Sequence, residues 1–159
     1  MSFRVGFGFD VHQFAENRKL RLGGIDIPYH KGLAGHSDAD VIIHALCDAL
    51  LGAAGMQDIG FHFPDSDHHY KNIDSSILLK QVVSMLAEKN YRVGNVDVTL
   101  CMEKPKISPF VPAMKSSLSS LMGIKEDDLS IKATTNEGMG FIGREEGVAA
   151  YAVALINSL

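Results

Sequence analysis

The hydrophobic pattern predicts a strand at the start of the chain and a hairpin soon after it. From Phe3 to Phe9, apolar side chains occupy every second position and alternate with glycine or a charged residue. This period of two is typical of a half-buried strand. Between residues 20 and 27, Gly23-Gly24 separates two apolar pairs, which indicates a β-hairpin.

A helix is predicted from about residue 38 to residue 52. Ser37 precedes Asp38-Ala39-Asp40, which offers an N-cap hydroxyl followed by carboxylates in the first turn. Apolar residues at helical spacing form one face: Ile42, Ala45, Leu46, Ala49 and Leu50. A second, polar stripe repeats every four residues: Asp40, His44 and Asp48.

The rest of the chain predicts further strands and helices that alternate along the sequence. The C-terminal segment Gly147–Ile156 fits either an alanine-rich helix or a buried strand. The order of the elements, with strands at both ends of the chain and helices between them, predicts an α+β fold in which helices cover a mixed β-sheet. The intervening elements are expected as follows: a loop over residues 58–70, a helix over 74–89 that Asn90 ends, a strand over 96–102, a helix near 110–122 before Gly123, and a strand through Ile131 and Ala133.

Composition limits the class of protein. The chain has 159 residues, 46% of them hydrophobic, which predicts one domain over residues 1–159 with enough core to fold without disulfides or a structural metal. Any bound metal is therefore expected to serve chemistry. The net charge of -4 without a basic run argues against nucleic acid as a partner.

The cysteines and the apolar segments bear on the compartment. Cys47 and Cys101 are far apart and form no CxxC motif, as expected in the reducing cytoplasm. No stretch has the length of a membrane span, and the strand pattern begins too early for a signal peptide. We therefore expect a cytoplasmic protein without a membrane partner.

Three residues are candidate metal ligands. Asp10 and His12 are two positions apart on a strand, so their side chains leave the same face. Together with His44 they would give zinc three ligands and an open fourth position, with Asp40 and Asp48 orienting His44. From spacing alone, ordinary solvated pairs of histidine and aspartate are the more common explanation of such residues.

Polar segments elsewhere suggest anion and polyol binding. His36-Ser37 stands before the predicted helix, where free backbone amides favour anions, although Ser37 is also explained as a simple cap. Two acidic segments, Asp58-Ile59-Gly60 and Phe63-Pro64-Asp65-Ser66-Asp67, suit hydroxyl groups or a hydrated cation, but such loops also serve solubility. His62, His68 and His69 fit no metal spacing and are interpreted as surface residues.

The segment Lys132–Arg144 is a candidate diphosphate site. Its hydroxyls, its glycine turns and Arg144 could hold a diphosphate through a divalent ion, with Glu137 as an oxygen ligand. A glycine-rich turn with scattered polar residues is the alternative. Lys104 and Lys106 could meet a phosphate or a nucleobase, or simply face solvent.

Taken together, these segments resemble one family across essentially the whole chain. The resemblance is to the 2-C-methyl-D-erythritol 2,4-cyclodiphosphate synthases of the non-mevalonate isoprenoid (MEP) pathway. The segment from Ser37 to Ala53 is the most specific of the matching blocks. The blocks occur in the family's order: Phe9-Asp10-Val11-His12; His36 to Ala53 with His44; Asp58-Ile59-Gly60; Phe63-Pro64-Asp65; Lys132-Ala133-Thr134-Thr135 with Glu137; and Gly143-Arg144.

The resemblance implies roles for individual positions. Asp10, His12 and His44 would bind zinc, and Glu137 would bind magnesium or manganese. His36 and Thr135 would stabilise the transition state, with Ser37 beside them. The remaining substrate contacts that it implies are Asp58, Ile59, Gly60, Phe63, Pro64, Asp65, Ser66 and Asp67 for the methylerythritol part; Met102, Glu103, Lys104, Pro105, Lys106, Ile107, Ser108, Thr134, Thr135, Asn136 and Glu137 for the cytidine diphosphate; and Phe141 and Arg144.

The resemblance also implies a reaction and an assembly. The 2-phosphate of 4-diphosphocytidyl-2-C-methyl-D-erythritol 2-phosphate would attack the β-phosphorus and release CMP, a phosphorus–oxygen lyase reaction. The family forms homotrimers with sheets around a threefold axis, active sites between subunits, and an axial cavity where Arg144 and Glu146 could receive an isoprenoid diphosphate. A zinc phosphodiesterase and a non-catalytic binding trimer are the alternatives.

Overall fold

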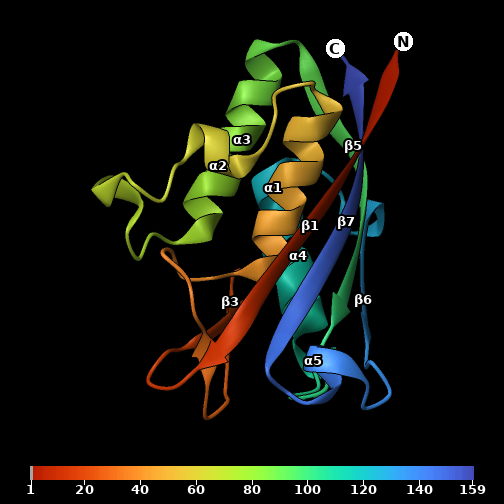
Figure 1. The fold of residues 1–159 in the computed structure, drawn as a ribbon. Helices are drawn as coiled ribbons and strands as arrows, with labels where there is room; N and C mark the ends of the chain where they lie inside the picture. Colours follow the sequence, from red (N-terminus) through yellow and green to blue (C-terminus); the bar gives the residue numbers. More distant parts are fainter. Residues whose placement is uncertain (1) are drawn as a thin grey trace.

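A mixed five-stranded sheet with helices on one side makes up the fold (Figure 1). The structure is a computed structural model and describes residues 2–159. The strands of the sheet, in spatial order, are β4 (Gly32–Leu33), β1 (Phe3–Ala15), β7 (Gly147–Ser158), β5 (Tyr91–Cys101) and β6 (Leu129–Thr134), and a separate ribbon pairs β2 (Leu20–Leu22) with β3 (Ile25–Ile27).

The helices are four-residue segments or run for three to four turns. The sheet and the helices packed on it confirm the predicted α+β class. The predicted hairpin is also present, with Gly23-Gly24 as the turn between β2 and β3. The helices are α1 (Val41–Ala53), α2 (Ile59–His62), α3 (Ser75–Glu88), α4 (Val111–Met122) and α5 (Gly140–Gly143), with 3-10 turns η1 (His68–Tyr70), η2 (Ser108–Phe110) and η3 (Glu126–Asp128).

The C-terminal segment is a strand and lies in the middle of the sheet. β7 pairs antiparallel with β1 on one side and with β5 on the other, whereas β5 and β6 run parallel. Hydrogen bonding at both edges of β7 decides between the two structures that its apolar sequence allowed. Its even-numbered residues from Val148 to Ile156 are buried, and Tyr151 and Val153 on the other face are exposed.

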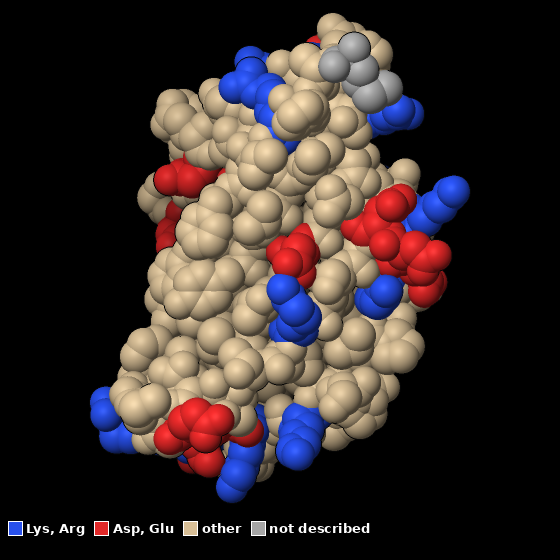
Figure 2. All heavy atoms as spheres, turned by 90° about the vertical axis from the view of Figure 1, so that its right-hand side faces the viewer, with Lys and Arg blue, Asp and Glu red and all other residues tan. Residues whose placement is uncertain are grey.

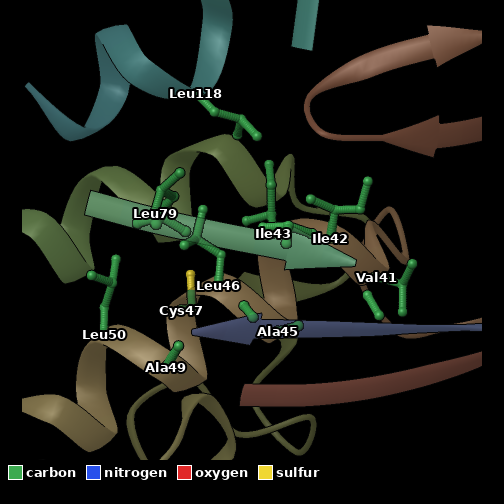
Figure 3. Close-up of a cluster of buried hydrophobic side chains, with 14 of the residues drawn as sticks. Val41, Ile42, Ile43, Ala45, Leu46, Cys47, Ala49, Leu50, Leu79 and Leu118 are labelled. Atoms are coloured by element: carbon green, nitrogen blue, oxygen red, sulfur yellow. The ribbon is translucent and has the colours of Figure 1, made fainter. Parts of the chain in front are cut away.

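Helix α1 lies directly on β1 because the residues between them are small. A Cβ at Gly6 would stand 1.9 Å from the carbonyl oxygen of Ala49, and a Cβ at Gly8 would stand 1.8 Å from that of Ala45. Figure 3 shows Ala45 and Ala49 beside the sheet, on the side of α1 away from Leu118. Glycine therefore allows the helix and the strand to approach closely.

The aromatic side of β1 is the exposed one, because its glycine side packs on α1. Phe7 is 62% exposed, and its neighbours on this face form an apolar surface on the side of the sheet away from the helices. Figure 2 shows this side, where broad uncharged areas lie between a few clusters of charged groups. The exposed apolar residues of β1 and β7 are Phe3, Val5, Phe7, Phe9, Val11, Tyr151 and Val153.

The predicted start of α1 was wrong by three residues. The N-cap is Asp40, not Ser37, and its carboxylate accepts from the amides of Ile43, Gly23 and Gly24. Asp40 is fully buried by these contacts, so it caps the helix and anchors the hairpin turn instead of joining a polar stripe. The apolar face predicted for this helix is buried as expected.

The loop predicted over residues 58–70 contains two short helices. Asp58 caps α2 by accepting from the amide of Phe61, and Asp67 caps η1 by accepting from that of His69. Each carboxylate stabilises a free helix-start amide. Within residues 2–159, no helix combines the length and the hydrophobicity needed to cross a membrane.

Candidate metal centre and a second cavity

β1 and α1 bring three metal-ligating side chains together. The Oδ2 atom of Asp10 lies 2.8 Å from Nε2 of His12 and 3.1 Å from Nδ1 of His44. The two histidine nitrogens are 3.3 Å apart. Within residues 2–159, this is the only group of three such side chains close enough to share an ion, which confirms the predicted triad.

The electrostatics of the triad favour an ionised carboxylate. Burial opposes ionisation of Asp10, but hydrogen bonds and charge from His12 and His44 outweigh it and lower its pKa to about 2. Burial likewise opposes protonation of His12, while Asp10 outweighs it and raises the pKa of His12. A carboxylate and two imidazoles form a donor set that suits a divalent cation such as zinc.

The histidines are held through their other ring nitrogens. Nδ1 of His12 lies 2.7 Å from the carbonyl oxygen of Ala34, and Nε2 of His44 lies 2.8 Å from Oγ of Ser75 and 3.1 Å from Oγ of Ser37. A carbonyl oxygen only accepts, so His12 donates from Nδ1 and leaves Nε2 free for a metal. Each histidine therefore directs the opposite ring nitrogen to the triad.

The prediction that Asp40 and Asp48 orient His44 was wrong. Asp40 caps α1 and contacts the hairpin, and Asp48 accepts from the amide of Ile59, 2.7 Å away. Asp48 therefore ties α2 to α1. The side chains that contact Nε2 of His44 are Ser37 and Ser75. Ser75 lies at the start of α3, and no sequence pattern connected it with His44.

A cavity of about 450 Å³ opens beside the triad. His36 lies on the wall of this cavity, and its Nε2 atom is 3.3 Å from the carbonyl oxygen of Asp67. His36 precedes Asp40, the N-cap of α1, by four positions, so it is not at the helix start as predicted. Asp58 and Asp67 are not part of the lining, because their carboxylates cap short helices. The lining includes eleven residues predicted for the site and four that were not: Asp10, His12, His36, Ser37, His44, Ile59, Gly60, Phe63, Pro64, Asp65 and Ser66; and Gly35, Tyr70, Ile73 and Leu78.

A second cavity, of about 600 Å³, shares no lining residue with the first. It lies where β5 and β6 end and η2 and α4 begin. Its lining contains predicted cytidine contacts together with apolar residues: Met102, Glu103, Pro105, Lys106, Ile107, Ser108, Thr134 and Thr135; and Val111, Pro112, Ile131 and Ala133.

The remaining predicted residues lie outside this lining. Lys104 forms an ion pair with Glu145, with 3.5 Å between Nζ and Oε1. Phe141 belongs to α5, and Arg144 follows it and pairs with Glu146. Asn136 and Glu137 also lie outside the lining.

A carboxylate orders the turn after β6. Oε1 of Glu103 accepts from the amide of Asn136 at 2.8 Å, and the amide of Glu137 lies 3.3 Å from Oγ1 of Thr135. These contacts hold the backbone, while the side chains of Thr135 and Glu137 are exposed. The turn thus presents its hydroxyl and its carboxylate to solvent.

Comparisons with known proteins identify the family of this chain. The model of the YgbB family matches residues 3–157. A relative from Bacteroides fragilis, named 2-C-methyl-D-erythritol 2,4-cyclodiphosphate synthase, is 60% identical over 157 residues, 99% of each chain.

Solved structures give the same result. The bifunctional IspDF from Campylobacter jejuni matches with a TM-score of 0.96 and 42% identity, covering 99% of this chain and 43% of that one. A CDP complex of IspF from Plasmodium falciparum matches with a TM-score of 0.86 and 33% identity over 99% and 97% of the two chains. These matches confirm the family resemblance seen in the sequence, and the chain belongs to the YgbB family.

Proposed function

We propose that this protein converts 4-diphosphocytidyl-2-C-methyl-D-erythritol 2-phosphate to 2-C-methyl-D-erythritol 2,4-cyclodiphosphate and CMP. The observation that carries the proposal is the triad of Asp10, His12 and His44 beside a polar cavity, in a chain that matches synthases of this name over its full length. The reaction is that of a phosphorus–oxygen lyase of the MEP pathway.

The reaction is an intramolecular phosphoryl transfer. An oxygen of the 2-phosphate forms a bond to the β-phosphorus, and the bond from that phosphorus to CMP breaks, with the electron pair leaving on CMP. A phosphate is already ionised at neutral pH and needs no general base. Two anions must approach each other, so positioning and charge neutralisation supply most of the catalysis.

The first cavity is assigned to the reacting phosphates and the methylerythritol group. Asp10, His12 and His44 would hold zinc, because one carboxylate oxygen and two imidazole nitrogens leave a fourth position open. When bound, such an ion supplies Lewis-acid stabilisation of phosphate oxygens. His36 and Ser37 line the same cavity and can donate hydrogen bonds to a transferring phosphoryl group.

The second cavity is assigned to the cytidine diphosphate. The relative solved as a CDP complex supports a cytidine ligand for this family. The loop from Met102 to Ser108 lines the cavity with both apolar and polar side chains, among them Lys106. Thr135 would contact the transferring phosphate, and Glu137 would bind magnesium or manganese between the phosphates. Asn136, Phe141 and Arg144 complete the proposed substrate contacts, with Lys104 at the outer edge.

We also propose that the active protein is a homotrimer whose sites lie between subunits. The apolar face of β1 and β7 is exposed in the single chain, and burying such a face is favourable in a permanent assembly. Because the two cavities share no wall in one chain, a neighbouring subunit can join the triad of one chain to the cytidine cavity of the next.

Two further expectations complete the proposal. Arg144 and Glu146 form an exposed pair and are candidates to admit an isoprenoid diphosphate to a cavity on the threefold axis. An unchanged melting temperature with geranyl diphosphate would remove this idea. The unpaired cysteines Cys47 and Cys101 fit a cytoplasmic location.

Phosphorus NMR of the purified protein with its substrate and magnesium tests the reaction. The proposal predicts signals of a cyclic diphosphate and CMP that disappear when a chelator removes zinc. A linear monophosphate product would indicate a phosphodiesterase instead. Unchanged substrate in the presence of bound zinc would favour a binding protein.

A further inference from the structure

We propose that Ser75 and Asp38 form a hydrogen-bonded relay that positions His44 and keeps its Nδ1 atom free for the metal ion. The proposal rests on the proposed metal site and assigns positioning roles to two residues outside the triad. Ser75 begins α3, and Asp38 lies between β4 and α1. The relay therefore joins separate parts of the chain to one ligand.

Each contact of the relay is short and shielded from solvent. Ser75 is fully buried, with Oγ 2.8 Å from Nε2 of His44 and 2.5 Å from Oδ1 of Asp38. The backbone amide of Ser75 also donates to Oδ2 of Asp38 at 2.9 Å. Two contacts to one carboxylate hold the serine in a single position.

The carboxylate decides the direction of every hydrogen bond in the relay. Asp38 accepts from the hydroxyl and the amide of Ser75 and from the amide of Asp40, and a carboxylate has no proton to give. The single hydroxyl proton of Ser75 therefore points at Asp38. Its oxygen is left to accept a hydrogen bond from Nε2 of His44. The ring therefore keeps a hydrogen on Nε2 when Nδ1 gives its lone pair to a metal ion beside Asp10 and His12.

Arg21 forms an ion pair with the same carboxylate of Asp38. Nε of Arg21, on β2, lies 3.4 Å from Oδ2 of Asp38. Arg21 is itself held by ion pairs with Asp26 and Asp74, each at 3.1 Å. Arg21 is thus a further partner of the carboxylate that accepts from Ser75.

The two histidines of the triad are thus controlled in different ways. His12 donates to a backbone carbonyl, that of Ala34, which no substitution of a side chain removes. Nε2 of His44 contacts the hydroxyls of Ser75 and Ser37, and Asp38 accepts from Ser75, so each of these side chains can be changed by itself. Partners of this kind are known to change metal affinity by about 10- to 100-fold when they are removed.

Zinc affinity in the absence of substrate, measured by competition with a chelator, tests the relay. Ser75→Ala is expected to bind zinc about 10- to 100-fold more weakly than the wild type. Ser119→Ala is the matched control, because Ser119 is also a buried helix serine but bonds only to the carbonyl oxygen of Ser116. It should bind zinc as the wild type does.

A double-mutant cycle separates a relay from a general loss of structure. In Asp38→Asn, the new side-chain amide can donate to Oγ of Ser75, so the serine hydroxyl turns to donate to Nε2 of His44. The ring hydrogen of His44 then moves to Nδ1, the atom that would bind zinc, and we expect weaker zinc binding. Because Asp38 acts on His44 through Ser75, Asp38→Asn/Ser75→Ala should bind zinc no more weakly than Ser75→Ala alone. The visible spectrum of the cobalt-substituted protein should change in Ser75→Ala and remain unchanged in Ser119→Ala.

The outcomes distinguish the relay from the proposed function. Wild-type zinc affinity in Ser75→Ala, or fully additive losses in the double variant, would overturn the relay and leave the synthase proposal intact. A wild-type protein that binds no zinc would overturn the metal site and the relay together. Weakened zinc binding in Ser75→Ala without product formation by the wild type would support the relay and contradict the synthase.

Discussion

The two cavities differ in how firmly their functional groups are held. Around the triad, His12 and His44 are largely buried and each ring nitrogen has a defined partner. In the second cavity, Lys106, Thr134 and Thr135 are exposed, and Glu103 orders only the backbone of the turn. The proposed metal site, called the metal half below, is therefore held within one chain. The proposed cytidine site, called the nucleotide half, leaves its side chains exposed.

Removing a ligand should break the metal half alone. His44→Ala is expected to abolish turnover and most zinc binding but to leave a folded trimer, because the core does not depend on the ion. Metal analysis, a product assay and light scattering measure the three properties. His30→Ala, at an exposed histidine, is the control and should retain all three; unfolding of His44→Ala would refute a purely catalytic metal.

A charge on the exposed sheet face should separate the two halves. Phe7→Glu is expected to give monomers that bind zinc normally but have lost turnover, because a buried carboxylate opposes assembly of the apolar faces. Light scattering and zinc titration measure these effects. Ile77→Glu places the same charge on an exposed apolar position of α3 and should stay trimeric. Monomeric wild-type protein at micromolar concentration would count against the assembly.

A methyl group between β1 and α1 should loosen the metal half. Gly8→Ala would place its Cβ 1.8 Å from the carbonyl oxygen of Ala45, so the helix must move, at a cost of about 1–3 kcal/mol or more. Zinc affinity should fall as well, because His44 lies on that helix. Gly52→Ala, where a Cβ meets nothing within 4 Å, should instead stabilise α1 by about 0.5–1 kcal/mol. Equal unfolding free energies of the two variants would contradict this packing.

The stability that the triad supplies without metal should depend on pH. The pKa of Asp10, lowered from 3.8 to about 2, corresponds to about 2 kcal/mol that is present above pH 3.8 and lost as pH falls toward 2. The raised pKa of His12 adds stability below pH 6.5 that is lost as pH rises through its folded value. Denaturation of metal-free protein should show the largest gap between wild type and Asp10→Asn from about pH 4 to pH 6.5. A gap that persists at pH 2 would contradict the pair.

Most of the fold could be predicted from sequence periodicity. The apolar spacing of α1 and the period of β5 gave the correct elements, since these patterns depend on burial of one face. The orientation of β1 was not predictable in the same way. Its aromatic face is exposed because Gly6 and Gly8 admit the helix, and glycine carries no hydrophobic signal.

Site residues could be predicted where they belong to a local sequence motif, and could not be predicted where they are distant in the sequence. Asp10 and His12 share a strand face, and His44 was found at helical spacing. Ser75 contacts His44 from 31 positions away, and no period in the sequence relates the two. The cap of α1 was misassigned because Ser37 and Asp40 are both good capping residues, and only the hairpin amides that Asp40 also binds distinguish them.

Mixing two inactive variants tests most directly whether the two halves meet between chains. His44→Ala removes the metal half and Thr135→Ala weakens the nucleotide half. Unfolding and refolding the two together in equal amounts should return about a quarter of the sites of a cyclic trimer to the wild-type pair, with a matching recovery of CMP release. Activity that stays at the level of the separate variants, in mixed trimers shown by mass spectrometry to have formed, would contradict a site built from two chains.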